Sequence, residues 1–214
     1  MKSVLVDYGA GNIHSVHKAL LRSGLDVTVS HDPAQAEEAA ALILPGQGHF
    51  GQVMRSFRDS GFEPLVRRHI ESGRPFLGIC VGLQLLLEGS EEAPRVAGLG
   101  ILPGTVKRFP AGSTVPQMGW NSLHKHGDSP LLEGVEDGSY VYYANSYYAD
   151  LEIDGSVPAM SGAYTTYGGV RFLGALSRGT LHATQFHPEK SQRVGLAILA
   201  NFSRLVRAGA PEAA

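Results

Sequence analysis

One cysteine, one histidine and one glutamate have the types and spacing of a nucleophile, a base and an orienting carboxylate. Cys80 is the only cysteine of the chain, and Gly78 and Gly82 flank it. His187 and Glu189 follow much later in the sequence, separated from each other by one residue. An imidazole that takes the proton of a thiol makes it a nucleophile, and a carboxylate orients the ring. These residues are predicted to form a Cys-His-Glu triad.

The segment 74–87 around Cys80 predicts a strand, a tight turn and a helix. An apolar run of strand length follows Pro75, and residues 81–87 have a helical pattern. Such an elbow lifts the thiol clear of the sheet and places it at a helix N-terminus, which favours the thiolate. The flanking glycines suit a strained turn that another backbone approaches closely. The alternative is that Cys80 is a small, buried apolar residue.

The predicted base and carboxylate lie in a rigid turn. Pro188, between His187 and Glu189, fixes one backbone torsion and disfavours helix for the residue before it. The turn can therefore present both side chains in one direction. The alternative for His187 alone is a hydrogen-bonded histidine of the core.

Strands and helices alternate through the first ninety residues, which predicts a parallel, doubly wound sheet. The expected strands are 4–7, 26–30, 41–44 and the run after Pro75, and the expected helices are 13–21, 32–39, 52–60 and 63–72. A glycine-rich loop at 8–12 is not a dinucleotide fingerprint, because His14 replaces its third glycine. A second glycine-rich loop, 45–51, can point backbone N–H groups into the crevice where α/β proteins bind ligands.

After residue 90 the pattern changes to short β-like runs. The expected strands are 105–109, 117–123, 140–143, 147–151, 158–165, 170–175 and 182–186, with a final helix over 194–206. They are predicted to add antiparallel strands at the edge of the sheet or as a small second layer. The chain 1–214 is thus predicted to be one three-layer α/β domain with a mostly parallel central sheet, flanking helices, an antiparallel β extension and a frayed tail over 208–214.

Composition and charge exclude several classes of protein. With 43% hydrophobic and 18% charged residues the chain is typical of globular proteins, and a net charge of −2 gives no support to nucleic-acid or membrane binding. It has no apolar segment long enough for a signal peptide or a membrane span, and one cysteine cannot form an internal disulfide, so a cytoplasmic setting is expected. The His124-Lys125-His126 string lacks nearby cysteines or paired carboxylates, so no metal site is expected.

Two strings resemble the signature of the class I, triad-type glutamine amidotransferases: Gly-Ile-Cys-Val-Gly-Leu-Gln over 78–84 and His-Pro-Glu over 187–189. The resemblance implies a flavodoxin-like fold without metal or organic cofactor. It also implies a reaction in which Cys80 attacks the side-chain amide of glutamine, ammonia leaves, and water releases glutamate from a glutamyl thioester. Backbone N–H groups of Val81 and of the loop at Gly46 and Gln47 would form the oxyanion hole. The residues implied in glutamine binding are Gln84, Gly48, Asn145, Ser146 and Tyr147.

Further strings, at 7–12, 45–51, 117–121 and 146–148, are similar to one subgroup of that family, the glutaminase subunits of imidazole glycerol phosphate synthases. This resemblance, over about 4–205, implies a heterodimer with a (β/α)₈-barrel cyclase subunit. The cyclase uses the ammonia to make imidazole glycerol phosphate and aminoimidazole carboxamide ribonucleotide in histidine biosynthesis. Aromatic anchors are enriched at interfaces, which also favours Trp120 as a contact. The residues implied at the interface or ammonia path are Asn12, Met118, Gly119, Trp120, Asn121, Tyr142 and Lys190.

Two residues depart from the subgroup pattern: Asn145 stands where histidine is frequent, and Gln47 replaces a small apolar residue. Two alternative functions stay open. One is another triad glutaminase or a γ-glutamyl hydrolase with a different acceptor, such as the glutaminase of pyridoxal phosphate synthase, against which the string at 118–121 argues. The other is a flavodoxin-like binding module in which Cys80 only packs.

Overall fold

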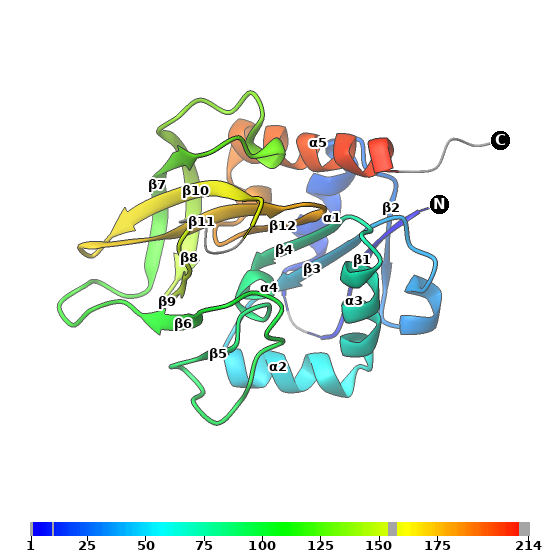
Figure 1. Cartoon of the computed structure of the whole chain (residues 1–214), viewed down its shortest axis with the longest axis horizontal. Helices are drawn as coiled ribbons and strands as arrows, with labels where there is room; N and C mark the ends of the chain where they lie inside the picture. Colours follow the sequence, from blue (N-terminus) through cyan, green and yellow to red (C-terminus); the bar gives the residue numbers. More distant parts are fainter. Residues whose placement is uncertain (1, 10, 154–157, 210–214) are drawn as a thin grey trace.

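The computed structural model describes residues 2–9, 11–153 and 158–209. Its centre is a nine-stranded sheet in the order β2-β1-β3-β4-β12-β11-β10-β7-β8. Helices α1 and α5 lie on one face of the sheet and α2 and α3 on the other, which gives three layers (Figure 1). A second, three-stranded sheet has the order β5-β6-β9.

The parallel part of the large sheet comprises β1 (Ser3–Val6), β2 (Val27–Ser30), β3 (Leu42–Gly46), β4 (Phe76–Cys80) and β12 (Leu181–Thr184). Every residue of β1, β3, β4 and β12 is buried, because helices cover both faces. In the register of β3 and β4, Gly46 stands opposite Cys80. The second glycine-rich loop therefore begins beside the cysteine.

The helices that cover the sheet are α1 (Ile13–Arg22), α2 (Phe50–Asp59), α3 (Phe62–Glu71) and α5 (Gln192–Gly209), close to the predicted bounds. The helix expected over 32–39 is a shorter 3₁₀ helix, η1 (Pro33–Ala36), whose first turn is capped by Asp32. Ala208 belongs to α5, so the frayed tail predicted from residue 208 is wrong there. Residues 210–214 of that tail, and residue 10 of the first glycine-rich loop, lie outside the described residues. No helix in the described part of the chain is both long and apolar enough to cross a membrane.

The helix predicted over 81–87 is wrong in length: α4 (Val81–Gln84) is a single turn. The carbonyl groups of residues 85–87 accept hydrogen bonds from the backbone N–H groups of residues 99–102. A carbonyl held by another segment cannot serve a following helical turn. The predicted macrodipole at Cys80 is correspondingly reduced to that of one turn.

The antiparallel extension consists of β11 (Val170–Arg178), β10 (Met160–Tyr167), β7 (Gln117–His126) and β8 (Ser139–Asn145). The small sheet adds β5 (Gly89–Ser90), which the sequence did not predict, β6 (Thr105–Arg108) and β9 (Tyr147–Asp150). Both expected arrangements, edge strands and a second layer, therefore occur. The strand predicted over 182–186 as part of the extension is β12, which pairs antiparallel with β11 as expected and also pairs in parallel with β4, so it joins the two parts of the sheet. Short 3₁₀ helices, η2 (Pro130–Leu132) and η3 (Pro188–Lys190), follow β7 and β12.

Two buried histidines make this fold sensitive to acid. His69 of α3 hydrogen-bonds the carbonyl oxygen of Pro75 through Nε2 at 2.9 Å, and its buried Nδ1 has no partner among the described residues. In β12, His182 Nδ1 lies 2.9 Å from Ser177 Oγ. Burial lowers the pKa of both rings to about 4. A second proton on His69 would place an N–H group at Nδ1 with no acceptor.

We expect the free energy of unfolding to fall as the pH decreases from about 6.5 to about 4. In this pH window the two histidines bind protons in the unfolded chain but stay neutral in the folded chain. The free energy of unfolding therefore falls by on the order of 3 kcal/mol for each histidine. Denaturant titrations over this pH range measure it. His69→Gln should remove the contribution of this histidine to the slope of the free energy of unfolding against pH. His14→Gln, at an exposed position, should leave that slope unchanged. An unchanged slope in His69→Gln would contradict the assignment.

Candidate active site

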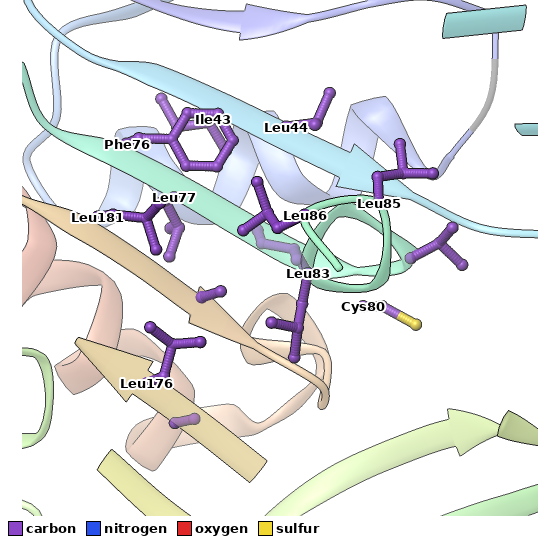
Figure 2. Close-up of a cluster of buried hydrophobic side chains, with 14 of the residues drawn as sticks. Ile43, Leu44, Phe76, Leu77, Cys80, Leu83, Leu85, Leu86, Leu176 and Leu181 are labelled. Carbon is purple, nitrogen blue, oxygen red and sulfur yellow. The ribbon is translucent and has the colours of Figure 1, made fainter. Parts of the chain in front are cut away.

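Cys80 lies in a strained turn between β4 and α4. Its backbone has φ 55° and ψ −110°, a conformation that residues other than glycine rarely adopt. The cysteine ends the buried strand, and in Figure 2 its sulfur points away from the leucine cluster around Leu83 and Leu86. The elbow predicted from the sequence is therefore present, with the thiol beyond the end of the sheet.

Three glycines let the elbow pack against β3. A Cβ atom on Gly82 would lie 1.9 Å from the carbonyl oxygen of Leu44, and one on Gly46 would lie 2.8 Å from the backbone nitrogen of Gly82. A Cβ atom on Gly78 would lie 2.9 Å from the carbonyl oxygen of Gly82. The close backbone approach predicted at Gly78 and Gly82 is confirmed, and it sets Cys80 and Val81 beside the loop that follows Gly46.

The predicted base and carboxylate form a buried pair directly after β12. His187 Nδ1 lies 2.8 Å from Glu189 Oε1, and their side chains are 4% and 1% exposed. Because β12 and β4 are parallel neighbours, Cys80, which ends β4, and His187, which comes after β12, lie at the same edge of the sheet. The sheet topology thus brings together three residues that are far apart in the sequence.

The electrostatics of this pair favour a protonated ring. Burial by itself lowers the pKa of His187, but the neighbouring Cys80 and the hydrogen-bonded Glu189 outweigh it and raise the pKa to about 10. An imidazolium next to sulfur favours the thiolate, which is the nucleophilic form of cysteine. The His187 ring is therefore protonated at neutral pH, next to the sulfur of Cys80.

A cavity of about 300 Å³ opens beside Cys80. All five residues predicted for glutamine binding line it: Gly48, Gln84, Asn145, Ser146 and Tyr147. Two residues predicted for the oxyanion hole, Gln47 and Val81, also line it, while Gly46 lies next to them in β3. Asn145 Nδ2 donates a hydrogen bond to the carbonyl oxygen of Tyr147, which holds the turn between β8 and β9. The cavity has the position and the polar wall that a small amide substrate requires.

Two polar residues of the site were not found from the sequence. Gln185 is fully buried, and its Nε2 lies 3.8 Å from Cys80 Sγ. The available signal was its place in the strand predicted over 182–186, two residues before His187, since alternate residues of a strand share a face. Glu92 lines the cavity, and its Oε2 accepts the backbone N–H of Phe50 at 2.6 Å. No local pattern signals Glu92, because it lies in an irregular loop after β5.

The residues predicted for a partner face lie outside this cavity. Asn12 and Lys190 line a more open hollow of about 700 Å³, which Gln47 and Gly48 also border. On β7, Met118 and Trp120 are 68% and 45% exposed. The ring of Trp120 packs edge to face against the ring of Tyr142, and Lys190 Nζ lies 5.8 Å from the centroid of the Tyr142 ring. These contacts connect β7 to the hollow that Lys190 lines.

Two other predicted interface residues have roles within the fold. Gly119 adopts φ 144°, which favours glycine, and Asn121 Nδ2 donates to the carbonyl oxygen of Thr166. Tyr140 of β8 is 60% exposed and was not predicted at this surface. Among the residues that the structure describes, no group of three or more His, Cys, Asp or Glu side chains could hold a metal ion.

Comparison with known proteins agrees with this geometry. The family model described as glutamine amidotransferase class-I matches residues 4–205. The chain belongs to this family. Its fold is that of a solved glutamine amidotransferase, with a TM-score of 0.73 at 21% identity over 95% of this chain and 98% of the other. The class I resemblance and the α/β fold class predicted from the sequence are confirmed.

Within the class-I glutamine amidotransferases, this chain is similar to proteins named imidazole glycerol phosphate synthase subunit HisH. The relative from Deinococcus radiodurans is 54% identical over 94% of this chain and 92% of its own length. The relative from Thermus thermophilus is 54% identical over 94% of this chain and 96% of its own length. These matches agree with the subgroup that the sequence strings indicated.

Proposed function

We propose that this chain is the glutaminase subunit of an imidazole glycerol phosphate synthase. It hydrolyses glutamine to glutamate and ammonia and delivers the ammonia to a cyclase subunit in histidine biosynthesis. One structural observation carries the proposal: the buried His187–Glu189 pair follows the strand next to Cys80, beside a cavity lined by the residues expected to bind glutamine. The near full-length similarity to HisH proteins supports the choice of pathway.

The first half of the proposed reaction uses the thiolate and the imidazolium. Cys80 Sγ attacks the carboxamide carbon of glutamine, and the oxyanion accepts hydrogen bonds from the backbone N–H groups of Val81 and of the Gly46–Gln47 loop. His187 gives its proton to the departing nitrogen as the C–N bond breaks, which releases ammonia and leaves a glutamyl thioester. Glu189 keeps the ring oriented throughout.

Hydrolysis of the thioester completes the cycle. His187, now neutral, takes a proton from water as the water oxygen attacks the thioester carbon. The C–S bond breaks, glutamate leaves and the thiolate is restored, so no metal or organic cofactor is needed.

Glu92 is proposed to recognise the α-ammonium group of glutamine, because it lines the cavity and carries a carboxylate of opposite charge. We expect Glu92→Gln to raise KM for glutamine about 10- to 100-fold, since a charge-assisted hydrogen bond is lost while an oxygen remains to accept the N–H of Phe50. Steady-state glutaminase kinetics in the presence of cyclase measure the effect. Glu88→Gln, at an exposed position that does not line the cavity, is the matched control. An unchanged KM in Glu92→Gln would exclude this role.

The partner is proposed to be a (β/α)₈-barrel cyclase that covers the exposed side chains of β7 and the hollow beside Lys190. Ammonia released into water becomes ammonium and is lost as a nucleophile, so a closed interface preserves the product. The exposed apolar side chains of Met118 and Trp120 supply the kind of anchor on which interfaces depend.

We expect Trp120→Ala to weaken cyclase binding at least about tenfold, because central aromatic anchors carry a large share of interface energy. Calorimetric titration of the cyclase measures the change. Val29→Ala is the matched control, since Val29 is also exposed but lies on β2, at the opposite edge of the sheet from β8. An equal loss of cyclase affinity in Trp120→Ala and Val29→Ala would argue against an interface at Trp120.

The function is tested by measuring glutamate release from glutamine with and without cyclase. We expect low turnover for the chain alone and stimulation by a cyclase that carries its own ligand. Comparable turnover in both conditions would count against a dedicated partner. Co-purification with the synthase subunit of another pathway, such as pyridoxal phosphate synthesis, would favour the alternative acceptor.

A further inference from the structure

Gln185 holds a fixed position between the nucleophile and the wall of the cavity. The residue directly follows β12, and its backbone N–H donates to the carbonyl oxygen of Gly174 at 2.8 Å. Its side chain is fully buried. The carboxamide reaches Cys80 with one end and Gln84 and Ala149 with the other.

The orientation of this carboxamide follows from its partners. The backbone N–H of Ala149 lies 3.3 Å from Gln185 Oε1, and a backbone N–H can only donate. The oxygen must therefore face Ala149, which leaves the NH₂ group facing Cys80 Sγ at 3.8 Å. Gln84 is fixed in the same way, because its Nε2 donates to the carbonyl oxygen of Tyr147 and to Gln185 Oε1, each at 3.1 Å.

We propose that Gln185 is a hydrogen-bond donor to the sulfur of Cys80 that stabilises the thiolate and ties the nucleophile to Gln84 in the wall of the substrate cavity. The proposal rests on the proposed function only in taking Cys80 as the nucleophile. A thiolate accepts an N–H better than a thiol does, so a fixed donor favours the charged form. Gln185 carries no charge of its own, so it adds this preference without altering the charge of the triad.

The ionisable groups around Cys80 come from four parts of the fold. His187 follows β12, Tyr8 follows β1, and two residues that line the same cavity as Cys80 are Glu92, in the loop after β5, and Tyr147 of β9. Burial, and next the charge of Cys80, raise the pKa of Tyr8, whose hydroxyl donates to the carbonyl oxygen of Pro45. Tyr8 is therefore neutral across the ordinary pH range. Changes at Gln185 leave these ionisable groups in place, so a shifted pH profile does not come from the loss of another titrating group.

The test is the rate of Cys80 alkylation by iodoacetamide as a function of pH, measured on the full chain. Because Cys80 is the only cysteine, the alkylated fraction reports on it alone. We expect Gln185→Met, which keeps the length of the side chain but has no N–H, to react about tenfold more slowly at pH 7. The pH of half-maximal rate should rise by about one unit.

Two further variants keep the test decisive. Asn201→Leu makes the same kind of change, amide to apolar isostere, at a buried residue of α5 that donates to Leu131 and Glu133. It should lower the melting temperature yet keep the wild-type pH profile. If Gln185→Met does not fold, Gln185→Asn retains a buried amide whose N–H falls about 1.5 Å short of sulfur, and it should shift the profile in the same direction.

A wild-type pH profile in a folded Gln185 variant, with only a lower melting temperature, would overturn the proposal and leave Gln185 a packing residue. Failure of the proposed function has a different signature. In that case the wild-type chain releases no glutamate from glutamine even with cyclase, while the effect of Gln185 on alkylation is still measurable.

Discussion

Cys80→Ser is expected to abolish glutamine-dependent synthesis by the complex, by about four orders of magnitude or more, and to spare synthesis from added ammonia. A serine hydroxyl in the same turn keeps the shape of the elbow but has no accessible anionic form at neutral pH. Only the first half-reaction, the release of ammonia, needs the nucleophile. The two activities are measured on one preparation of the complex, with glutamine or an ammonium salt as the nitrogen source. Loss of both the glutamine-dependent and the ammonia-dependent activity would indicate that Cys80 is required for the structure of the complex or for coupling between its subunits instead.

Gly82→Ala is expected to have the largest effect on stability of any single methyl group added at the site. The new Cβ atom would lie 1.9 Å from the carbonyl oxygen of Leu44, so β3 or the elbow must move. We expect a loss of about 3 kcal/mol or more in the free energy of unfolding, together with loss of glutaminase activity.

Gly89→Ala is the matched control for this substitution. A Cβ atom on Gly89 would meet nothing nearer than the carbonyl oxygen of Val96 at 3.9 Å. Denaturant titrations of both variants measure the difference. Near-equal stability of the two would show that the approach of the elbow to β3 is not what requires glycine at position 82.

The positions of Cys80, His187 and Glu189 were predictable because local rules determine each of them. Flanking glycines and an apolar run fix the elbow, and Pro188 fixes the turn that carries the base and the carboxylate. The one non-local step, that the two segments meet, was not predictable from local rules, because the sequence pattern placed the strand over 182–186 among the antiparallel strands. The pairing of β12 with β4 supplies that step.

The helix after Cys80 was overpredicted for a reason that lies outside its own sequence. Three buried leucines at 85–87 fit a helical pattern, but their carbonyl groups bond to residues 99–102. Competition from a distant segment for backbone hydrogen bonds leaves no trace in local periodicity. The consequence for the site is that backbone strain and neighbouring charge, more than a long helix, set the environment of the thiol.

Gln185 and Glu92 show the same limit for side chains. Both contact their partners through tertiary packing, Gln185 with Cys80 and Gln84, and Glu92 with Phe50. A polar residue at either position is compatible with many surroundings, so the sequence pattern alone does not distinguish a site residue from a solvated one. The exposure of Trp120 and Met118, by contrast, agrees with the surface that the sequence strings indicated.

The most direct test of the central claim is to treat the complex with a glutamine-analogue electrophile and map the adduct by mass spectrometry. The account predicts one adduct, on Cys80, that forms faster with ligand-bound cyclase and is blocked by excess glutamine. If the complex gave no adduct on Cys80, the chain would be better described as a flavodoxin-like binding module in which this cysteine only packs.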